Sequence, residues 1–166
     1  DRVIRHEGVL TGVAAPAGGK RAGGAGGIGW ADEHDLDAVA RADTAATGAD
    51  RARLVRALLD AGRLAVLRRD GAVAGYAALR PFGRGEVAGP VVAEDADGAR
   101  ALLAFLLADR AGCAVRVDTP RAAGLSPWLA GLGLAEAGAG IEMSRGAPVI
   151  ASGGLHRYAL AAQALG

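Results

Sequence analysis

The feature that most constrains the fold is a strand–loop–helix–strand unit in the middle of the chain. A Val-rich apolar run at 86–93 leads through a short acidic loop into a helical pattern at 99–111, and 114–118 reads as the next strand. The peptide N–H groups at the start of such a helix are the usual way to hold a phosphate. The unit therefore predicts an α/β domain with a ligand site where the first strand meets the helix.

The size and composition suit one soluble domain with a hydrophobic core. The chain has 166 residues, of which 51% are hydrophobic but only 4% aromatic, so we expect a core of Leu, Val and Ala. The formal net charge is +1. Nucleic acids and anionic membranes require clustered Lys and Arg, so neither is expected as a partner.

Metal and disulfide chemistry are not expected. Cys113 is the only cysteine, which excludes an internal disulfide and zinc sites built from several thiolates. It follows a helix-ending Gly and precedes a buried strand, so we expect an inert core thiol. His6, His34 and His156 are far apart in sequence and lack metal-ligand spacing, which favours surface roles for them.

No targeting or membrane signal is visible in the sequence. No apolar run approaches the roughly 20 residues that cross a bilayer, and no signal peptide is recognisable. A cytoplasmic location is the default expectation. The chain begins at Asp1 and not at a methionine, which leaves room for residues upstream of it.

Hydrophobic periodicity predicts the remaining elements. Asp70-Gly71 is a strong hairpin signal, Asp32 is a suitable N-cap, and Tyr76 alternates with apolar neighbours and should be in the core. Before the central unit we expect a strand within 1–13, a Gly/Ala-rich linker at 14–27, a strand and helix from 28, a helix at 50–61 and strands at 64–69 and 72–80. After it we expect a helix at 125–132 and a strand at 135–143. The tail at 155–166 is either helix or strand.

This order of elements resembles the GNAT superfamily of N-acetyltransferases over about 28–145. The run Trp-Ala-Asp-Glu-His-Asp-Leu at 30–36 looks like the first turn of that family's first helix, and Leu-Gly-Leu at 132–134 resembles the Leu-Gly-Phe that ends its last helix. Residues 89–95 and the tail are most similar to the C-terminal-type domain of tandem bacterial GNAT proteins.

The resemblance implies an α/β (α+β) fold, with a mixed central sheet of about six to seven strands flanked by about four helices. We divide the chain into an N-terminal strand and linker (1–27), a GNAT-like acetyltransferase domain (28–146) and a C-terminal tail that packs on it (147–166).

The resemblance also implies an acetyl-CoA site, in a cleft where the strands at 86–93 and 114–118 part. The backbone of Val91, Val92 and Ala93 would pair with the pantetheine arm. Gly98, Ala99 and Arg100, at the start of the following helix, would take the pyrophosphate. The Gly-Pro pair at 89–90 favours a disrupted strand because Pro donates no ladder hydrogen bond. The alternative is a plain edge strand.

The pyrophosphate loop departs from the family pattern of Arg or Gln, two residues, Gly, one residue, then Gly or Ala. The pattern falls on 94–99, where Glu94 replaces the cation or amide and Asp97 replaces the first glycine. Carboxylates at a helix start cap the amides that a phosphate needs and repel the phosphate. Arg100 in the first turn would offset this charge, and an ordinary acidic N-cap is the alternative.

Candidates for proton transfer are few. Glu86 is the candidate base, with a solvated edge charge as the alternative. The family's tyrosine acid falls on Leu129, which cannot donate a proton. Tyr158, in a tail that would fold over the cleft, is therefore the first candidate acid. Ser126 is a substitute donor, unless it caps the helix that Pro127 begins.

Two functions remain open from the sequence. The first is an N-acetyltransferase that moves an acetyl group from acetyl-CoA to a small-molecule amine. The second is a degenerate, non-catalytic domain of the same fold that binds a ligand or docks on a partner. A second GNAT domain or a second copy of the chain is the macromolecular partner that we expect.

Overall fold

The protein is a single mixed β-sheet with helices on both faces. The computed structural model describes residues 2–14, 26–143 and 153–165. Within them the strands are β1 (Arg2–Val9), β2 (Gly27–Trp30), β3 (Arg63–Arg69), β4 (Ala72–Phe82), β5 (Gly85–Ala93), β6 (Ala114–Pro120), β7 (Ala135–Ile141) and β8 (His156–Ala159). The helices are α1 (Leu36–Thr47), α2 (Ala52–Ala61), α3 (Ala96–Leu107) and α4 (Ser126–Gly131), with short 3-10 turns at Glu33–Asp35 and Arg121–Ala123.

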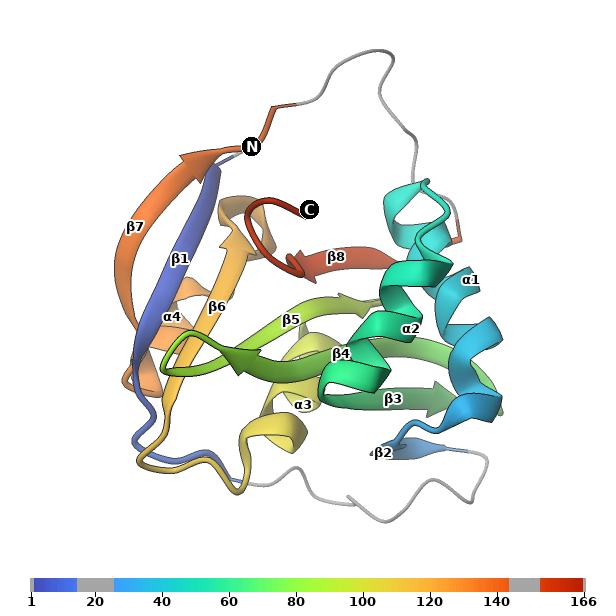
Figure 1. Cartoon of the computed structure of the whole chain (residues 1–166), viewed down its shortest axis with the longest axis horizontal. Helices are drawn as coiled ribbons and strands as arrows, with labels where there is room; N and C mark the ends of the chain where they lie inside the picture. Colours follow the sequence, from blue (N-terminus) through green and yellow to red (C-terminus); the bar gives the residue numbers. More distant parts are fainter. Residues whose placement is uncertain (1, 15–25, 144–152, 166) are drawn as a thin grey trace.

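The order of strands in the sheet is β2-β3-β4-β5-β6-β1-β7, and β8 pairs with β5 off this path (Figure 1). The α/β class with a mixed sheet and four helices is confirmed. The described sheet has eight strands, against six to seven predicted. The added strand is the tail, which forms β8 and settles the choice between helix and strand.

The N-terminal strand is an internal strand of the sheet. β1 lies between β6 and β7 and is antiparallel to both. It contributes to the core, since Val3 and Ile4 are buried. His6 is also fully buried on this strand, so the expected surface role for it is wrong: the strand that carries it is covered on both edges and by α4.

The hairpin between β3 and β4 forms where the sequence predicts it. Asp70 and Gly71 have φ angles of 50° and 79°, the pair of positive values that a two-residue type I′ turn requires. The turn holds β3 and β4 in register from Arg69–Ala72 to Arg63–Leu79, with one shift after Leu67. This hairpin places β5 against the opposite edge of β4.

Two apolar clusters fill the space between the sheet and its helices. One lies under α1 and α2 and includes Val39, Leu58 and Tyr76, which confirms Tyr76 as a core residue. The other lies under α3 and α4 and is dominated by leucines such as Leu102 and Leu129. None of the described helices is long and apolar enough to cross a bilayer.

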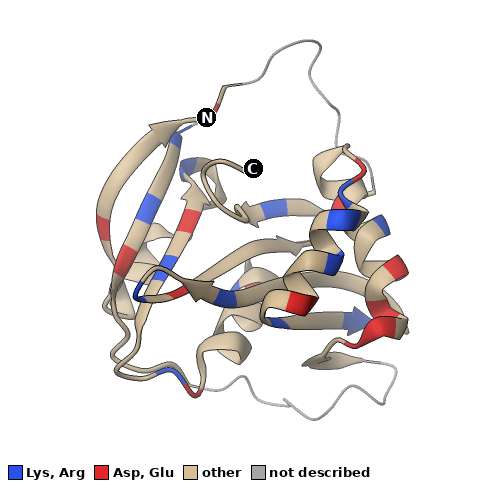
Figure 2. Ribbon diagram, viewed as in Figure 1, with Lys and Arg blue, Asp and Glu red and all other residues tan. Residues whose placement is uncertain are grey.

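Two local predictions need correction. Cys113 is exposed, because it lies in the turn after α3 rather than in the buried part of β6. Helix α3 runs from Ala96 to Leu107, earlier at both ends than predicted. Its N-cap is Asp95, which begins the helix as soon as β5 ends. Residues of both charges are interspersed over the described elements (Figure 2).

Candidate functional site

β5 and β6 part after two paired positions. The parallel pairing joins Glu86 to Val115 and Val87 to Arg116, and it does not continue toward the carboxyl ends of the strands. The pair Gly89-Pro90 follows directly, and Pro90 has no N–H to donate to a ladder. The strands then diverge into an open angle (Figure 1), as the sequence predicts for 86–93 and 114–118.

β8 lies in this angle. It is antiparallel to β5, with Ala159 opposite Val91, Arg157 opposite Val92 and His156 opposite Ala93. The other edge of the same three residues pairs with β4. Both edges of β5 are therefore occupied at Val91, Val92 and Ala93, and all three are fully buried. The predicted cofactor-binding backbone is present but holds the chain's own tail.

The tail also binds β6, so it spans the angle from one arm to the other. The Leu160 amide donates to the Asp118 carbonyl oxygen at 2.8 Å, and the Thr119 hydroxyl donates to the Tyr158 carbonyl oxygen at 2.8 Å. Gly89 lets the tail come close, because a Cβ there would stand 2.1 Å from the Leu160 carbonyl oxygen. We call residues 155–165 the C-terminal segment.

Two arginines hold the end of the C-terminal segment. Arg80 donates from Nη2 to the Ala161 carbonyl oxygen at 2.8 Å, and Arg51 donates from Nη1 to the Leu165 carbonyl oxygen at 3.2 Å. Arg51 is itself fixed by a bidentate bond to buried Asp43, at 2.8 and 2.7 Å. The segment is thus tied to β4 and to the network beneath α1.

The start of α3, where a pyrophosphate was predicted, is occupied by carboxylates. Asp95 accepts a hydrogen bond from the Gly98 amide at 2.6 Å. Arg69 bonds Glu94 at 2.7 Å and Asp95 at 3.0 Å. The hydrogen bond from Arg69, followed by that from the Gly98 amide, lowers the pKa of Asp95. Asp95 is therefore a charged N-cap that satisfies an amide which a phosphate would otherwise use.

The other predicted pyrophosphate ligands lie in the same turn. Ala99 is fully buried and its amide donates to the Asp95 carbonyl oxygen at 3.1 Å. Arg100 bonds Asp97 at 2.8 Å. In this conformation the compensating cation faces a carboxylate of its own helix.

The three predicted catalytic side chains lie on three different elements. Glu86 is at the closed end of β5 and forms an ion pair with Arg110 at 2.7 Å. Ser126 begins α4, 2.9 Å from Nε2 of His6. Tyr158 is on β8, half-buried against the core under α3. Only Tyr158 lies in the angle between the parted strands.

The environment of Tyr158 suits a group that stays protonated. Burial, with a smaller contribution from the charge of Asp95, raises its pKa above the ordinary value, while Arg100 acts in the opposite direction. Asp95 and Arg100 both belong to the start of α3, so Tyr158 lies within the electrostatic reach of that helix terminus.

Ser126 is held by a buried histidine. His6 Nδ1 lies 2.9 Å from the Leu134 carbonyl oxygen, and a carbonyl only accepts. In the neutral imidazole Nδ1 is therefore the donor, and Nε2 accepts from the Ser126 hydroxyl. The hydroxyl proton is directed at His6.

Asp118 is a carboxylate that sequence reasoning missed. It lies near the open end of β6, is completely buried, and is paired with Arg116 two residues earlier, with N–O distances of 2.9 to 3.2 Å. The amide of Gln163 in the C-terminal segment reaches it at 3.4 Å. The sequence does hold a signal for it. In 115–118, Val115 and Val117 alternate with Arg116 and Asp118, which places the two charged side chains together on one face at the carboxyl end of a strand, where α/β sheets bind ligands.

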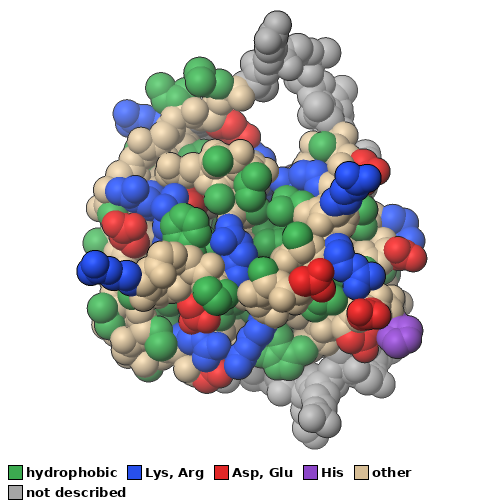
Figure 3. Space-filling view, viewed as in Figure 1, with side chains coloured by type: hydrophobic (Ala, Val, Ile, Leu, Met, Phe, Trp, Pro, Cys, Tyr) green, Lys and Arg blue, Asp and Glu red, His purple; other side chains and the backbone are tan. Residues whose placement is uncertain are grey.

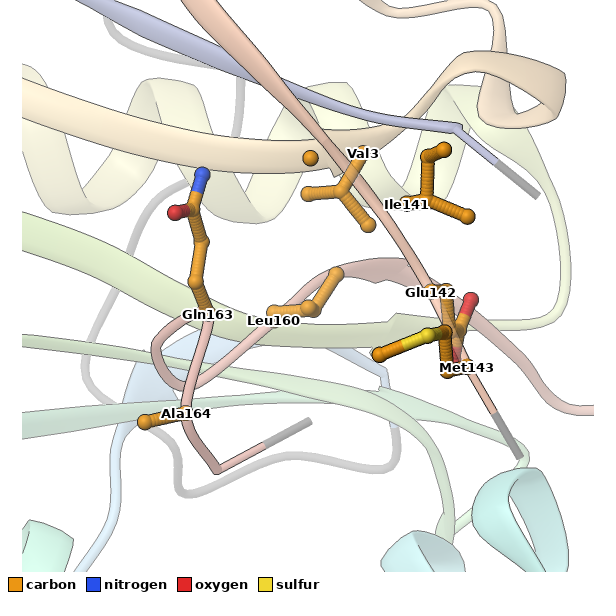
Figure 4. A pocket seen from close by; sticks show the side chains of 8 residues that line it. Val3, Ile141, Glu142, Met143, Leu160, Gln163 and Ala164 are labelled. Carbon is orange, nitrogen blue, oxygen red and sulfur yellow. The ribbon is translucent and has the colours of Figure 1, made fainter. Parts of the chain in front are cut away.

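A cavity of about 460 Å³ lies between the C-terminal segment and two strands of the sheet (Figure 4). One wall is formed by the ends of β1 and β7, and the other by the C-terminal segment. Gln163 lines the cavity and also contacts Asp118. The lining residues are Val3, Gly140, Ile141, Glu142, Met143, Leu160, Gln163 and Ala164.

The face that carries α1 and α2 combines apolar and cationic groups. Arg80 and Arg116 stand over the ring of Phe82, 5.5 and 5.1 Å from its centroid. Apolar side chains gather in the middle of this face, with arginines beside them (Figure 3). Among the described residues, no three His, Cys, Asp or Glu side chains are grouped to hold a metal ion.

Comparisons with known proteins agree with this geometry. A crystal structure of a Pyrococcus horikoshii protein, described as a candidate acetyltransferase, matches 99% of the chain with a TM-score of 0.62 and 20% sequence identity. The match covers 52% of that protein, so the chain spans about half its length. No curated protein sequence matches. A family model described as an acetyltransferase (GNAT) domain matches residues 39–159, so the chain belongs to the GNAT acetyltransferase family.

Proposed function

We propose that the domain transfers an acetyl group from acetyl-CoA to an amine, at the angle between β5 and β6. The observation that carries this proposal is the pairing of β8 with Val91, Val92 and Ala93. It shows that the free edge of β5 accepts an extended chain through backbone hydrogen bonds. A pantetheine arm, which carries two amides, would use the same groups.

The pyrophosphate would then lie at the start of α3, near Gly98, Ala99 and Arg100. For this to happen the Asp95 carboxylate must leave the Gly98 amide, and Arg100 must turn from Asp97 to the phosphates. The Asp95 carboxylate is half-exposed and the Asp97 carboxylate is largely exposed. An exposed ion pair contributes little to stability, and an N-cap hydrogen bond contributes about 1 kcal/mol. The rearrangement is therefore energetically accessible.

In the reaction, the amine nitrogen forms a bond to the thioester carbonyl carbon while the carbon–sulfur bond breaks. A base takes the proton of the amine and an acid protonates the departing thiolate. We assign the base to Asp118, because it lies at the open end of the strands and contacts Gln163, which lines the cavity, whereas Glu86 is at the closed end. Tyr158 lies on β8, which would leave the angle when the pantetheine arm binds, so we assign protonation of the thiolate to water instead of the Tyr158 phenol.

The cavity that Gln163 lines is the proposed acceptor site. It opens on the face of the sheet that carries α1 and α2, while α3 and its N-terminus lie on the opposite face. An amine in the cavity and acetyl-CoA at α3 would approach the angle from opposite sides. We place the reaction in the cytoplasm, and a second GNAT domain or a second copy of the chain remains the proposed partner.

A second candidate is a non-catalytic domain of the GNAT fold. Two observations favour it: β8 occupies the cofactor edge, and Asp95 caps the anion-binding helix start. Such a domain would keep the C-terminal segment in place permanently and act through its surface.

Calorimetry with acetyl-CoA separates the two candidates. The enzyme requires saturable binding at millimolar acetyl-CoA or below, and release of free thiol when a panel of small amines is added. A protein that binds acetyl-CoA without thiol release in the presence of any amine is a sensor. A folded protein that gives no heat and no thermal shift at millimolar acetyl-CoA would overturn the proposed function and leave the docking domain.

A further inference from the structure

We propose that the C-terminal segment is a built-in competitor of acyl-CoA. It occupies the edge of β5 in the resting protein and leaves when acyl-CoA binds. This inference rests on the proposed function. It follows from the register of β8, which pairs with the same three residues, Val91, Val92 and Ala93, that would bind the pantetheine arm.

Simultaneous binding is sterically excluded at this edge. Each β5 residue has a single N–H and a single C=O, and successive residues direct them to opposite edges of the strand. β4 pairs with the other edge at Gly75, Tyr76 and Ala77, so only the groups that now face β8 could bind the arm. The space toward β6 is closed as well, by the hydrogen bonds of Leu160 and Thr119 across the angle. An acyl-CoA chain and β8 therefore compete for one set of donors and acceptors.

The segment covers the rest of the proposed machinery as well as the cofactor edge. Gln163 covers the Asp118 carboxylate, and Leu160, Gln163 and Ala164 form one wall of the cavity. Withdrawal of the segment thus exposes the β5 edge, uncovers the proposed base and removes one wall of the acceptor cavity, which leaves the surface of β1 and β7 open to the amine. Displacement of this one segment would therefore make both the cofactor edge and the proposed base accessible.

The short length of β8 and its irregular pairing are typical of a segment that can be displaced. β8 has only four residues, and its register shifts between Val91 and Val92. Short segments that are held by few contacts open locally at low free energies. Besides its pairing with β5 and its contacts with Asp118, the segment is held by bonds from Arg80, Arg51 and Thr119 to its carbonyl oxygens.

Closing the segment covalently is the sharpest test. Val91 and Ala159 face each other across β5 and β8 and belong to the same apolar cluster, so their side chains point the same way. Facing residues of an antiparallel pair have Cα atoms about 4.5 to 5.5 Å apart, which a disulfide can bridge. The double variant Val91→Cys with Ala159→Cys is made with Cys113→Ser, so that no third thiol interferes.

The same preparation is then titrated with acetyl-CoA in its oxidised and reduced forms. We expect no binding when the disulfide is closed and restored binding after reduction.

Variants that weaken the attachment of the C-terminal segment should instead increase the affinity for acetyl-CoA. Arg80→Met and Thr119→Val each remove one hydrogen bond to the segment and should tighten acetyl-CoA about fivefold. Arg84→Met, in the exposed β4–β5 turn at the closed end, is the matched control and should leave the affinity unchanged.

The outcomes separate the two proposals. Equal affinity of the oxidised and reduced forms would overturn the competitor and leave the acetyltransferase intact. If neither the wild type, the loosened variants nor the reduced form binds at millimolar acetyl-CoA, the proposed function itself fails. Hydrogen exchange gives an independent check: the amides of 157–160 should exchange faster when acetyl-CoA saturates the protein, and unchanged or slower exchange there contradicts displacement.

Discussion

The backbone amide of Leu160 donates to the carbonyl oxygen of Asp118 at 2.8 Å, and this bond joins the tail to the far arm of the parted strands. Asp118 is bound a second time through its side chain, by Gln163. One residue of β6 thus fixes the C-terminal segment by both its backbone and its carboxylate. The C-terminal segment consequently links the Asp118 carboxylate, the cavity that Gln163 lines and the edge of β5 that is proposed to bind the cofactor.

Replacing Asp118 by Asn should abolish most of the acetyl transfer. An amide of the same shape cannot accept the proton of the amine, and loss of a general base costs about 100-fold or more in kcat. The measurement is thiol release at saturating acetyl-CoA and amine, with calorimetry to show that binding persists. Glu86→Gln is the matched variant, and a loss there but not in Asp118→Asn would return the base to Glu86.

Replacing Asp95 by Asn should keep the helix cap and remove its charge. Asn and Asp cap helices about equally well, so at neutral pH the thermal midpoint should fall only by the small contribution of the lost charge. Loss of a negative charge at the helix start favours an anion there, and we expect acetyl-CoA to bind about two- to fivefold more tightly. Weaker binding would show that the carboxylate does not oppose the pyrophosphate.

The same residue gives an acid-dependent signature. The pKa of Asp95 is lowered from 3.8 in the folded protein, so its stabilising contribution is present above pH 3.8 and is lost as the pH falls through the lowered value. Asp95→Asn lacks this contribution. The difference in thermal midpoint between wild type and variant should therefore shrink between neutral pH and pH 3, and an unchanged difference would contradict the shift.

Tyr76→Phe should destabilise the protein. The Tyr76 hydroxyl donates to Asp43 at 2.5 Å inside the core. Asp43 keeps its two bonds from Arg51 in the variant, and loss of one hydrogen bond to a charged group costs about 1.5–3 kcal/mol. Chemical denaturation measures the change. Tyr158→Phe, which alters a phenol that is only partly buried, should cost less, and an equal loss in both variants would argue against a special role of the Asp43 contact.

Burial and the charge of Asp43 raise the pKa of Tyr76 well above 10.0. A group whose pKa is raised by folding stabilises the protein below its unfolded-state pKa and loses that contribution as the pH rises. The wild type should therefore lose stability above about pH 10, and Tyr76→Phe should lose less over the same range. Parallel pH profiles would contradict this assignment.

Ser126→Ala should cost stability and leave catalysis unchanged. The variant removes the donor to buried His6 Nε2 and should reduce the free energy of unfolding by about 1–2 kcal/mol. Thr11→Ala is the control, because the Thr11 hydroxyl bonds the Leu132 carbonyl oxygen at an exposed site. A fall in kcat without loss of stability would instead support the predicted role of Ser126 as a proton donor.

Local sequence determined the elements whose patterns are short-range. Asp70-Gly71 supplies the two positive φ angles of the β3–β4 turn, and Asp32 accepts from the His34 amide to cap the turn before α1. The Gly-Pro pair at 89–90 marks where β5 leaves β6. These features depend on backbone conformation and hydrogen bonding within a few residues, so composition and spacing were sufficient to predict them.

Only the tertiary structure decided what lies beside these elements. His6 looks like an exposed strand residue, but β1 inserts between β6 and β7 and buries it. Tyr158 belongs to a tail whose hydrophobic residues follow neither helical nor strand periodicity. The tail forms a strand because the edge of β5 that leaves β6 offers backbone groups to pair with. The sequence alone determined that an open edge forms at Val91–Ala93. Which chain occupies that edge depends on contacts between residues more than 60 positions apart, and no local pattern encodes them.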